Sequence, residues 1–380
     1  LVNDLLEYES FERIASIIEK APTNDQSGIL NVLDDDKAQS VIELLNVEEQ
    51  EGIAEIMGYP DDSAGLLMNT EVFTLHESIT AGEAIKTLQD QENAEMVFYL
   101  YITDNDDRLV GVISLRALTT TPSSTNLKDI MIKKVHSIRP ETDQEDVARI
   151  VAQYNFLAVP VLDSDSKLLG IVTVDDVVDV IREEATEDFL QMAGAGKDRE
   201  ILLKSSWENA KARLPWLFAS WVGGVIAASL IGVFENMLEN IIALAAFIPV
   251  ILGMGGNIAT QSSTIIVRGM ATGRVNEGGE IKLILKEVQV GIMLGILYGI
   301  LLGVFARFTF SEAPDNLGFV VGLSICVSMI VAATVGTIIP LILRKLDIDP
   351  AIATGPFVTT SIDILGVLFY FIIAGYFLSI

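Results

Sequence analysis

The chain has 380 residues, and acidic side chains outnumber basic ones by 52 to 25, which gives a formal net charge of −27. The excess lies in the first 200 residues, with 41 acids and 15 bases, whereas the remaining residues hold 11 acids and 10 bases. Such an acidic part suits water and cations, and its charge argues against nucleic acid or an anionic lipid surface as its main partner. The single cysteine, Cys326, excludes a disulfide framework.

The first 60 residues predict a group of short helices. Asn46 followed by Glu49 resembles a capping box at the start of a helix. Gly58 and Pro60 would end that helix. We expect a small helical domain that acts as a scaffold and carries no chemistry.

An internal repeat follows the helical domain. Residues 102–115 align with residues 161–174, and each copy predicts a strand, an acidic turn, a second strand and the start of a helix. Upstream, residues 72–84 align with residues 135–147 as a strand that leads into a helix. The chain therefore contains two β-α-β-β-α modules, an arrangement that resembles a tandem pair of CBS domains.

Five apolar stretches occupy the rest of the chain. Each reaches or exceeds the approximately 18 residues that cross a bilayer, and a soluble core rarely holds five in succession. They cover residues 214–234, 240–267, 288–306, 317–343 and 351–380. A charged helical stretch that ends at Pro215 would connect the second module to the membrane.

Basic residues gather on one side of the predicted spans. They precede the first span and lie in the loops after the second and fourth spans, whereas the other two loops are acidic apart from Arg307. By the positive-inside rule, the acidic N-terminal part is cytoplasmic and the C-terminus lies outside. We expect a multi-pass protein of the cell membrane (plasma or inner membrane), in contact with the lipid bilayer.

The sequence thus predicts a multidomain chain with helical, α/β and membrane-spanning parts. These are a partial α-helical N-terminal domain (1–60), a first CBS domain (61–125), a second CBS domain (126–182), a charged connecting or plug helix (183–213) and a five-helix transmembrane domain (214–380).

A carboxylate, Asp363, lies well inside the fifth span. Ionised, it is costly there unless it meets water or a cation, so we place it on a cation pathway, with helix packing by a protonated Asp as the alternative. Prolines that follow Asp349 and Gly355 weaken helical hydrogen bonding nearby. The freed carbonyls and the hydroxyls of Thr359 and Thr360 would then line the pore.

The second span carries a matching irregularity. It contains a proline and several glycines, and Asn257 and Gln261 lie one turn apart on one face. Beside Asp363, these amides would make an oxygen-lined path; the alternative is close glycine packing with both amides bonded across helices. Oxygen ligands favour hard cations such as Mg²⁺, which keeps much of its hydration shell in a wide site. A symmetric dimer would supply two copies of Asp363.

Acids are dense on the second module and on the connecting helix. A solvated face is the simplest interpretation of any one of them, but a dimer of such domains would repel itself unless divalent cations bridged it. We therefore predict regulatory cation ligands among Asp143, Glu145, Asp175, Asp176, Asp179, Glu184, Glu187 and Asp188. As a secondary hypothesis, Thr173 and Asp176 would suit the ribose of ATP or another adenosine nucleotide.

In several of its motifs the chain resembles the MgtE family of magnesium channels, whose membrane part is related to a family of eukaryotic solute carriers. The resemblance rests on residues 59–68, 170–177, 184–188, 255–261 and the Asp349–Asp363 pair. It implies a homodimer with its pore between the second and fifth membrane helices and Asp363 as the selectivity carboxylate. It also implies that a plug helix around Glu187 and Asp188 closes the pore when Mg²⁺ fills the acidic interface. The helical domain is shorter than usual for the family, so we expect its start to be missing.

We predict a Mg²⁺-selective, Mg²⁺-gated channel for magnesium uptake, with no enzymatic activity. When Mg²⁺ is scarce, unbridged carboxylates repel and the connecting helices withdraw. One alternative is an ion-coupled divalent-cation carrier, which would give no single-channel currents. A less favoured alternative is a membrane-embedded, metal-dependent enzyme regulated by the CBS modules, which lacks a catalytic cluster because only one acid lies deep in the membrane part.

Overall fold

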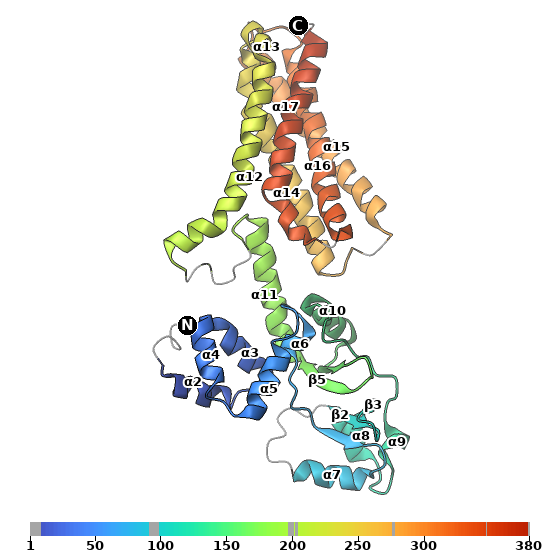
Figure 1. The fold of residues 1–380 in the computed structure, drawn as a ribbon. Coiled ribbons are helices and arrows are strands. Elements are labelled where there is room, and N and C mark those ends of the chain that lie inside the picture. Colours follow the sequence, from blue (N-terminus) through green and yellow to red (C-terminus); the bar gives the residue numbers. More distant parts are fainter. Residues whose placement is uncertain are drawn as a thin grey trace. The chain divides into compact units, whose positions relative to one another are not determined.

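The computed structural model of the chain describes residues 9–90, 99–196, 201, 204–275, 278–346 and 348–378. The chain forms two compact units, one ending at Arg182 and the other starting at Glu183. Helix α11 (Val174–Met192) runs from the first unit into the second (Figure 1). Each unit has hydrophobic clusters of its own.

Short helices form the N-terminal part of the first unit. They are α2 (Phe11–Ile18), α3 (Thr23–Val32), α4 (Asp35–Ile42) and α5 (Val47–Ile56). The predicted cap of α5 is present, because Asn46 Oδ1 accepts the Glu49 N–H at 2.9 Å. Ile14, Ile18 and Leu30 are buried in one small cluster, so the helices hold together by their apolar faces.

The two repeated modules have related sheets. In the first, β1 (Thr74–His76) pairs parallel with β2 (Tyr99–Thr103), which pairs antiparallel with β3 (Leu109–Ser114). In the second, β4 (Ala158–Leu162) and β5 (Leu168–Thr173) form the antiparallel pair, and a parallel bridge between residues 138 and 161 takes the place of the first strand. The helices of the modules are α7 (Ala81–Gln89), α8 (Leu115–Thr120), α10 (Gln144–Tyr154) and the start of α11.

The acidic turn between the antiparallel strands has the same geometry in both modules. Asp104 Oδ1 accepts the backbone N–H groups two and four residues later, at 2.9 and 3.0 Å. Asp163 Oδ1 does the same at 2.9 and 2.8 Å. Such bonds to the local backbone are the reason that aspartate favours turns. These acids therefore stabilise the turns, and the sequence repeat is also a structural repeat.

Each module takes a helix from the segment that precedes the other one. Helix α6 (Ala64–Leu67) precedes the first module, but Ala64 and Met68 are buried in the core of the second. Helix α9 (Leu127–Ile130) precedes the second module, but Leu127 is buried in the core of the first. The modules, expected to meet near residue 125, thus exchange helices across that point.

In the second unit, five of the described helices are long and apolar enough to cross a membrane, as predicted. They are α12 (Ser206–Val233), α14 (Ala243–Ala271), α15 (Glu280–Thr309), α16 (Leu317–Lys345) and α17 (Pro356–Leu378), with the short α13 (Glu235–Asn240) between α12 and α14. Two begin earlier than expected. Helix α12 starts at a capping box of Ser205 and Glu208 and continues through Pro215, and α15 starts at Glu280 rather than at residue 288.

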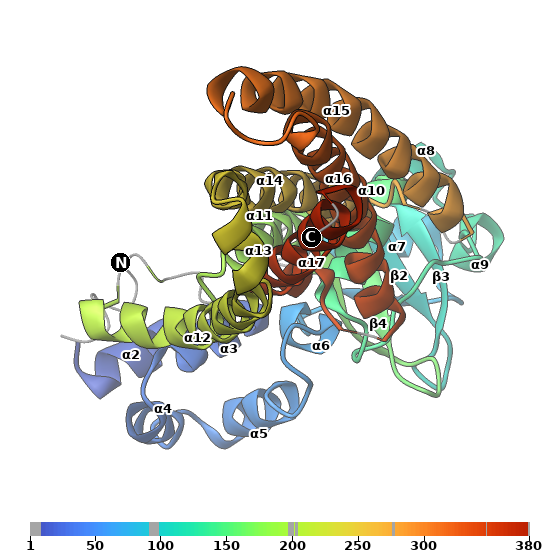
Figure 2. The same cartoon turned by 90° about the horizontal axis from the view of Figure 1, so that it is seen from above.

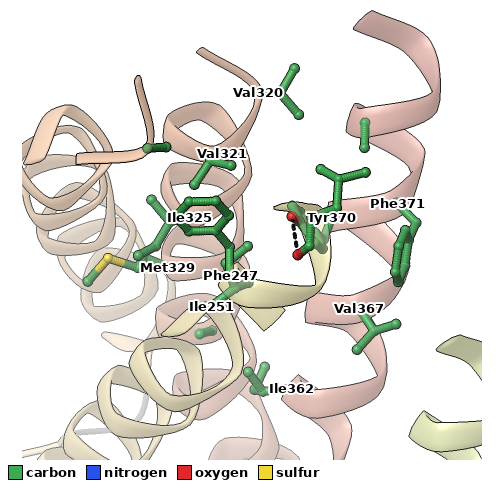
Figure 3. Close-up of a cluster of buried hydrophobic side chains, with 14 of the residues drawn as sticks. Phe247, Ile251, Val320, Val321, Ile325, Met329, Ile362, Val367, Tyr370 and Phe371 are labelled. Carbon is green, nitrogen blue, oxygen red and sulfur yellow. Dashed lines mark hydrogen bonds between the residues drawn. The ribbon is translucent and has the colours of Figure 1, made fainter. Parts of the chain in front are cut away.

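Helix α16 lies between α15 on one side and α14 and α17 on the other (Figures 1 and 2). Figure 3 shows the cluster that joins three of these helices, in which Ile325 of α16 lies near Phe247 of α14. The hydroxyl of Tyr370, in α17, donates a hydrogen bond to the Leu244 carbonyl of α14 at 2.8 Å. A buried hydroxyl without such a partner would be costly, so this bond fixes α17 against the start of α14.

Helix α15 packs on α16 through glycines. A Cβ added at Gly299 would lie 2.6 Å from the Gly322 carbonyl oxygen, and one added at Gly303 would lie 2.6 Å from that of Gly318. Backbones approach this closely only where side chains are absent. These glycines of α15 therefore serve close packing.

Candidate ion pathway

The entrance of α17 consists of a capped turn and a helix break. Asp349 Oδ1 accepts the Ala351 N–H at 2.8 Å and starts a short 3-10 helix, η1 (Pro350–Thr354). Gly355 (φ −81°, ψ −134°) separates η1 from α17, which begins at Pro356. The prolines have no N–H to donate. The fifth span is therefore interrupted at the place where the sequence predicted a weakened helix.

Asp363 lies about two turns inside α17 and is half-buried. Its carboxylate forms no hydrogen bond or salt bridge with any residue that the structure describes. A carboxylate at this depth is costly unless water, a proton or a cation reaches it. Asp363 is thus available for a ligand that the protein does not itself provide.

The threonines before Asp363 have partners of their own. Thr359 Oγ1 lies 3.4 Å from the Gly355 carbonyl and 3.3 Å from the Pro356 carbonyl, within its own helix. Thr360 packs on Gly223 of α12, where an added Cβ would overlap its side chain. The Thr359 hydroxyl therefore contacts carbonyls at the start of its own helix, and Thr360 packs α17 against α12.

Asn257 and Gln261 lie on an exposed face of α14, one and two turns after the exposed Gly253. Neither amide side chain forms a hydrogen bond with another residue in the described part of the chain. The cross-helix amide bonds considered as the alternative are thus absent there. Because unpaired amides are costly against lipid, this face requires a polar neighbour.

Helices α14 and α17 bring these groups to similar depths. A Cβ added at Gly255 would lie 2.9 Å from Ile362 Cγ2, and the bond from Tyr370 to the start of α14 shows that the helices run antiparallel. With a rise of about 1.5 Å per residue, Asn257 and Asp363 lie within about 5 Å of each other along the helix axis. The amide face and the carboxylate therefore occupy neighbouring levels.

The end of α11 meets the entrance of α17. The buried Gln191 donates from Nε2 to Glu187 Oε1 at 2.9 Å and to Asp349 Oδ2 at 2.7 Å. Gly194, at φ +68°, follows the helix, and its added Cβ would lie 3.7 Å from Pro356. Glycine adopts this left-handed conformation without steric cost. One buried amide thus attaches the connecting helix to the acid that starts η1.

Asp188 lies beside this amide link. Burial is the main cause that raises the pKa of Asp188 to about 6; the charges of Asp349 and Glu187 act in the same direction, and Arg268 of α14 opposes them. Among the described residues, no three or more His, Cys, Asp or Glu side chains lie close enough to hold a metal. The three acids thus repel one another without forming a complete metal site.

The other predicted regulatory acids occupy separate positions in the first unit and on α11. Asp143 caps α10 by accepting the Glu145 N–H at 2.8 Å. Asp179 forms an exposed salt bridge with Arg182 at 3.4 Å, an interaction of little energetic weight. Asp175 is exposed and Glu184 is partly exposed.

Thr173 and Asp176 form a local cap at the start of α11. Asp176 Oδ2 accepts hydrogen bonds from the Thr173 backbone N–H, at 3.2 Å, and from the Thr173 hydroxyl. Burial raises the pKa of Asp176, and the bonds from Thr173 partly oppose that rise. The pair stabilises the strand-to-helix turn, and its role in nucleotide binding stays a prediction.

Sequence reasoning missed two residues, Gln191 and Glu287. The only signal for Gln191 was its spacing of one turn from Glu187. Glu287 is 6% exposed and accepts a hydrogen bond from Ser262 Oγ at 2.8 Å. It lies in a membrane-spanning helix because α15 begins earlier than the apolar stretch. Glu287 is thus a buried acid in a helix long enough to span the membrane, near the end of α15 that carries Lys282 and Lys286. That Asp363 alone lies deep in the membrane part stays a prediction.

Family models match most of the chain, apart mainly from residues 184–247. The MgtE divalent cation transporter model matches residues 248–373, the CBS domain model matches 64–122 and 127–183, and the MgtE intracellular N domain model matches 1–62. The "Magnesium transporter MgtE" of Bacillus subtilis is 38% identical over 335 residues, which are 88% of this chain and 74% of the relative. The chain belongs to the MgtE family.

A second relative agrees with this assignment, and two solved structures are similar to part of the chain. The Enterococcus faecalis "Magnesium transporter MgtE" is 39% identical over 87% of this chain and 72% of its own length. The solved "soluble part of a magnesium transporter" is 39% identical, covering 48% of this chain and 72% of that one, with a TM-score of 0.47. The "cytosolic domain of the Mg2+ channel MgtE in complex with ATP" is 35% identical, covering 47% and 73%, with a TM-score of 0.45.

Membership confirms the resemblance and the architecture that the sequence predicted: an MgtE N-terminal domain, a CBS pair and a C-terminal part with five apolar helices. This member of the MgtE family is therefore a multi-pass membrane protein.

Proposed function

We propose that this MgtE-family chain is a Mg²⁺-selective channel for magnesium uptake that cytoplasmic Mg²⁺ closes. Its relatives are named magnesium transporters, and its site offers oxygen ligands only, which hard cations prefer. The observation that carries the proposal is the unpaired Asp363, on a helix whose entrance the acidic end of α11 covers.

The pathway in this proposal runs between α14 and α17 of two chains in a homodimer. Asn257 and Gln261 form an exposed polar face that lipid would not solvate. A second copy would cover this face and would bring a second Asp363 to the same depth. The ion then keeps much of its water shell, with the Gly355 break and the Asp349 carboxylate at the entrance.

Gating in this proposal depends on the charge at that entrance. Burial first, and then the charges of Asp349 and Glu187, raise the pKa of Asp188, and a divalent cation would relieve the repulsion on this carboxylate. Bound Mg²⁺ would therefore hold the connecting helix over α17. Loss of Mg²⁺ would leave Gln191 as a neutral link between two like charges.

Acids of the first unit, together with Glu184 of α11, would add to this response. Asp143, Glu145, Asp175, Asp176, Asp179 and Glu184 belong to a part of the chain with a large negative charge. Two such domains in a dimer would repel each other, and Mg²⁺ between them would bring them together. In this proposal the acidic part is cytoplasmic and the C-terminus lies outside, which the distribution of basic residues supports.

Flux and single-channel recordings test this function directly. The full chain, reconstituted in liposomes, should admit Mg²⁺ and give single-channel currents, which a carrier would not give. Raising Mg²⁺ on the side of the N-terminal domains should reduce the open probability and should protect residues 1–200 from protease. Flux without currents would favour the ion-coupled carrier, and currents that ignore Mg²⁺ on that side would overturn the gating proposal.

Nucleotide binding is a separate part of the proposal. We place an adenosine nucleotide near Thr173 and Asp176, where a carboxylate could accept ribose hydroxyl protons. ATP titration should shift the thermal unfolding midpoint of the chain. An equal shift in Asp176→Ala would contradict the assignment of this carboxylate.

A further inference from the structure

A basic pocket of about 500 Å³ lies where the loop after α14 meets the start of α15. Arg274, Lys282, Lys286 and Gln289 supply its polar lining, and leucines of α15 supply apolar surface. The three cationic side chains are exposed. None forms a salt bridge with another residue in the described ranges of the chain. The pocket therefore carries positive charge that the described protein does not neutralise.

Residues 274 and 275 beside the pocket are held in place. The backbone N–H groups of Arg274 and Val275 both donate to the Gly269 carbonyl, at 2.8 and 3.1 Å. Arg344 donates to the Val275 carbonyl at 3.2 Å, and the Val275 side chain packs with Leu283 against the end of α14. Arg274 thus has a fixed backbone position relative to the two lysines.

One face of α15 changes from cationic to apolar along its length. Lys282, Lys286 and Gln289 recur at helical spacing, and the same spacing continues to Met293 and Leu297. Met293 is 71% exposed and Leu297 is 52% exposed. Helix α15 is apolar enough to span a bilayer. This face therefore has hydrogen-bond donors at its first turns and exposed apolar side chains farther along the helix.

We propose that the pocket binds the headgroup of an anionic phospholipid. Arginine and lysine donate to phosphodiester oxygens, and basic pockets at the cytoplasmic ends of membrane helices suit acidic lipid headgroups. The acyl chain lies along Met293 and Leu297. A soluble phosphate would have the same donors, but it would leave this exposed hydrocarbon without a partner. The site is separate from the ion pathway proposed above.

Binding to the purified full chain tests this site. Native mass spectrometry or a fluorescent-lipid titration would compare phosphatidylglycerol with phosphatidylcholine. We expect the acidic lipid to bind at least about tenfold more tightly, and we expect the triple variant Arg274→Gln, Lys282→Gln, Lys286→Gln to lose roughly 100-fold, about fivefold for each charge. A matched variant, Lys133→Gln, Lys134→Gln, Lys167→Gln, removes three charges from the first unit and should change binding less than about twofold.

Two further arms separate a lipid from a soluble anion. Met293→Gln should weaken phosphatidylglycerol binding severalfold, and inorganic phosphate at millimolar concentration should not displace the lipid. Unchanged lipid affinity in the triple variant would overturn the site. Complete displacement by inorganic phosphate, with Met293→Gln unaffected, would overturn the lipid assignment.

Discussion

Two helix pairs of the second unit use glycine in different ways. Between α15 and α16, glycines let backbone meet backbone, so that added Cβ atoms would lie within 2.6 Å of carbonyl oxygens at Gly299 and Gly303. Between α14 and α17, Gly255 accommodates Ile362, and the helices keep polar groups nearby. The side chains of Asn257 and Asp363 form no hydrogen bonds within the described residues. The first pair is a closed contact, and the second keeps side-chain oxygen atoms that no described residue engages.

The two acids in membrane helices differ in the same way. Glu287 is 6% exposed and accepts a hydrogen bond from Ser262, whereas Asp363 is half-buried and has no such partner in the described chain. A satisfied buried group stabilises its surroundings, and an unsatisfied one requires water, a proton or an ion. The comparison supports a structural role for Glu287 and the proposed transport role for Asp363, and substitutions test the difference.

Asp363→Asn should have the largest effect on flux. Removing one member of a desolvated charge interaction costs about 3 kcal/mol, which corresponds to roughly 100-fold. Mg²⁺ uptake into proteoliposomes should therefore fall to background while the thermal midpoint stays unchanged. Glu287→Gln is the matched control, because an amide oxygen can still accept the Ser262 bond; its flux should stay within about threefold of the parent chain. Equal loss in both variants would remove the distinction.

Gly299→Leu should have the largest effect on stability. The new side chain would meet the Gly322 carbonyl, and overpacking of this kind costs about 3 kcal/mol or more. We expect a lower unfolding temperature by intrinsic fluorescence and a smaller yield of folded protein. Gly232→Leu provides the control, since Gly232 has no atom within 4 Å of an added Cβ; its midpoint should hardly move. A stable Gly299→Leu variant would show that the α15–α16 contact is not closed.

Gln191→Leu should shift gating and leave conduction intact. It removes the hydrogen bond that joins α11 to Asp349, worth about 1.5 kcal/mol, so closing should require roughly tenfold more Mg²⁺. Single-channel open probability against Mg²⁺ concentration measures the shift. Gln50→Leu removes an amide that bonds to a backbone carbonyl in the helical domain and should behave as the parent. An unshifted curve would separate the amide link from gating.

The smallest expected effect is the release of a proton from Asp188 when Mg²⁺ binds. Because its pKa rises from 3.8 to about 6, the folded protein binds more protons than the unfolded chain between those values, and stability falls as the pH rises through them. Mg²⁺ needs the ionised form, so about half a proton per chain should leave at about pH 6 and almost none at about pH 8. Calorimetry in two buffers of different ionisation enthalpy measures this release, which Asp188→Asn should abolish.

The sequence was sufficient to predict the features that depend on composition, on the internal repeat and on the spacing of hydrophobic residues. The repeat predicted two modules with matching acidic turns, and hydropathy predicted the spans, which the structure confirms. The start of α15 was missed because its first turns carry alternating charges that resemble a loop, although Leu283 and Ile284 pack inward. Glu287 was missed for the same reason.

Contacts between residues far apart in the chain could not be predicted from the sequence. The contact between Gln191 and Asp349 joins residues far apart in the chain, and the spacing of neither residue indicates the other. The sequence also did not predict the exchange of α6 and α9 between the modules. The pattern of a short amphipathic helix shows which face is apolar but does not indicate which core that face packs against. Asp363 and Asn257 were selected for their residue types, and their assigned roles stay predictions.

The exchange of α6 and α9 makes the two modules a single folding unit. A cut near residue 125 would leave the first module without Leu127 of α9 in its core. It would leave the second module without Ala64 and Met68 in its core. We therefore expect that neither half folds when it is grafted alone onto another protein, and that a domain boundary useful for engineering lies outside both modules.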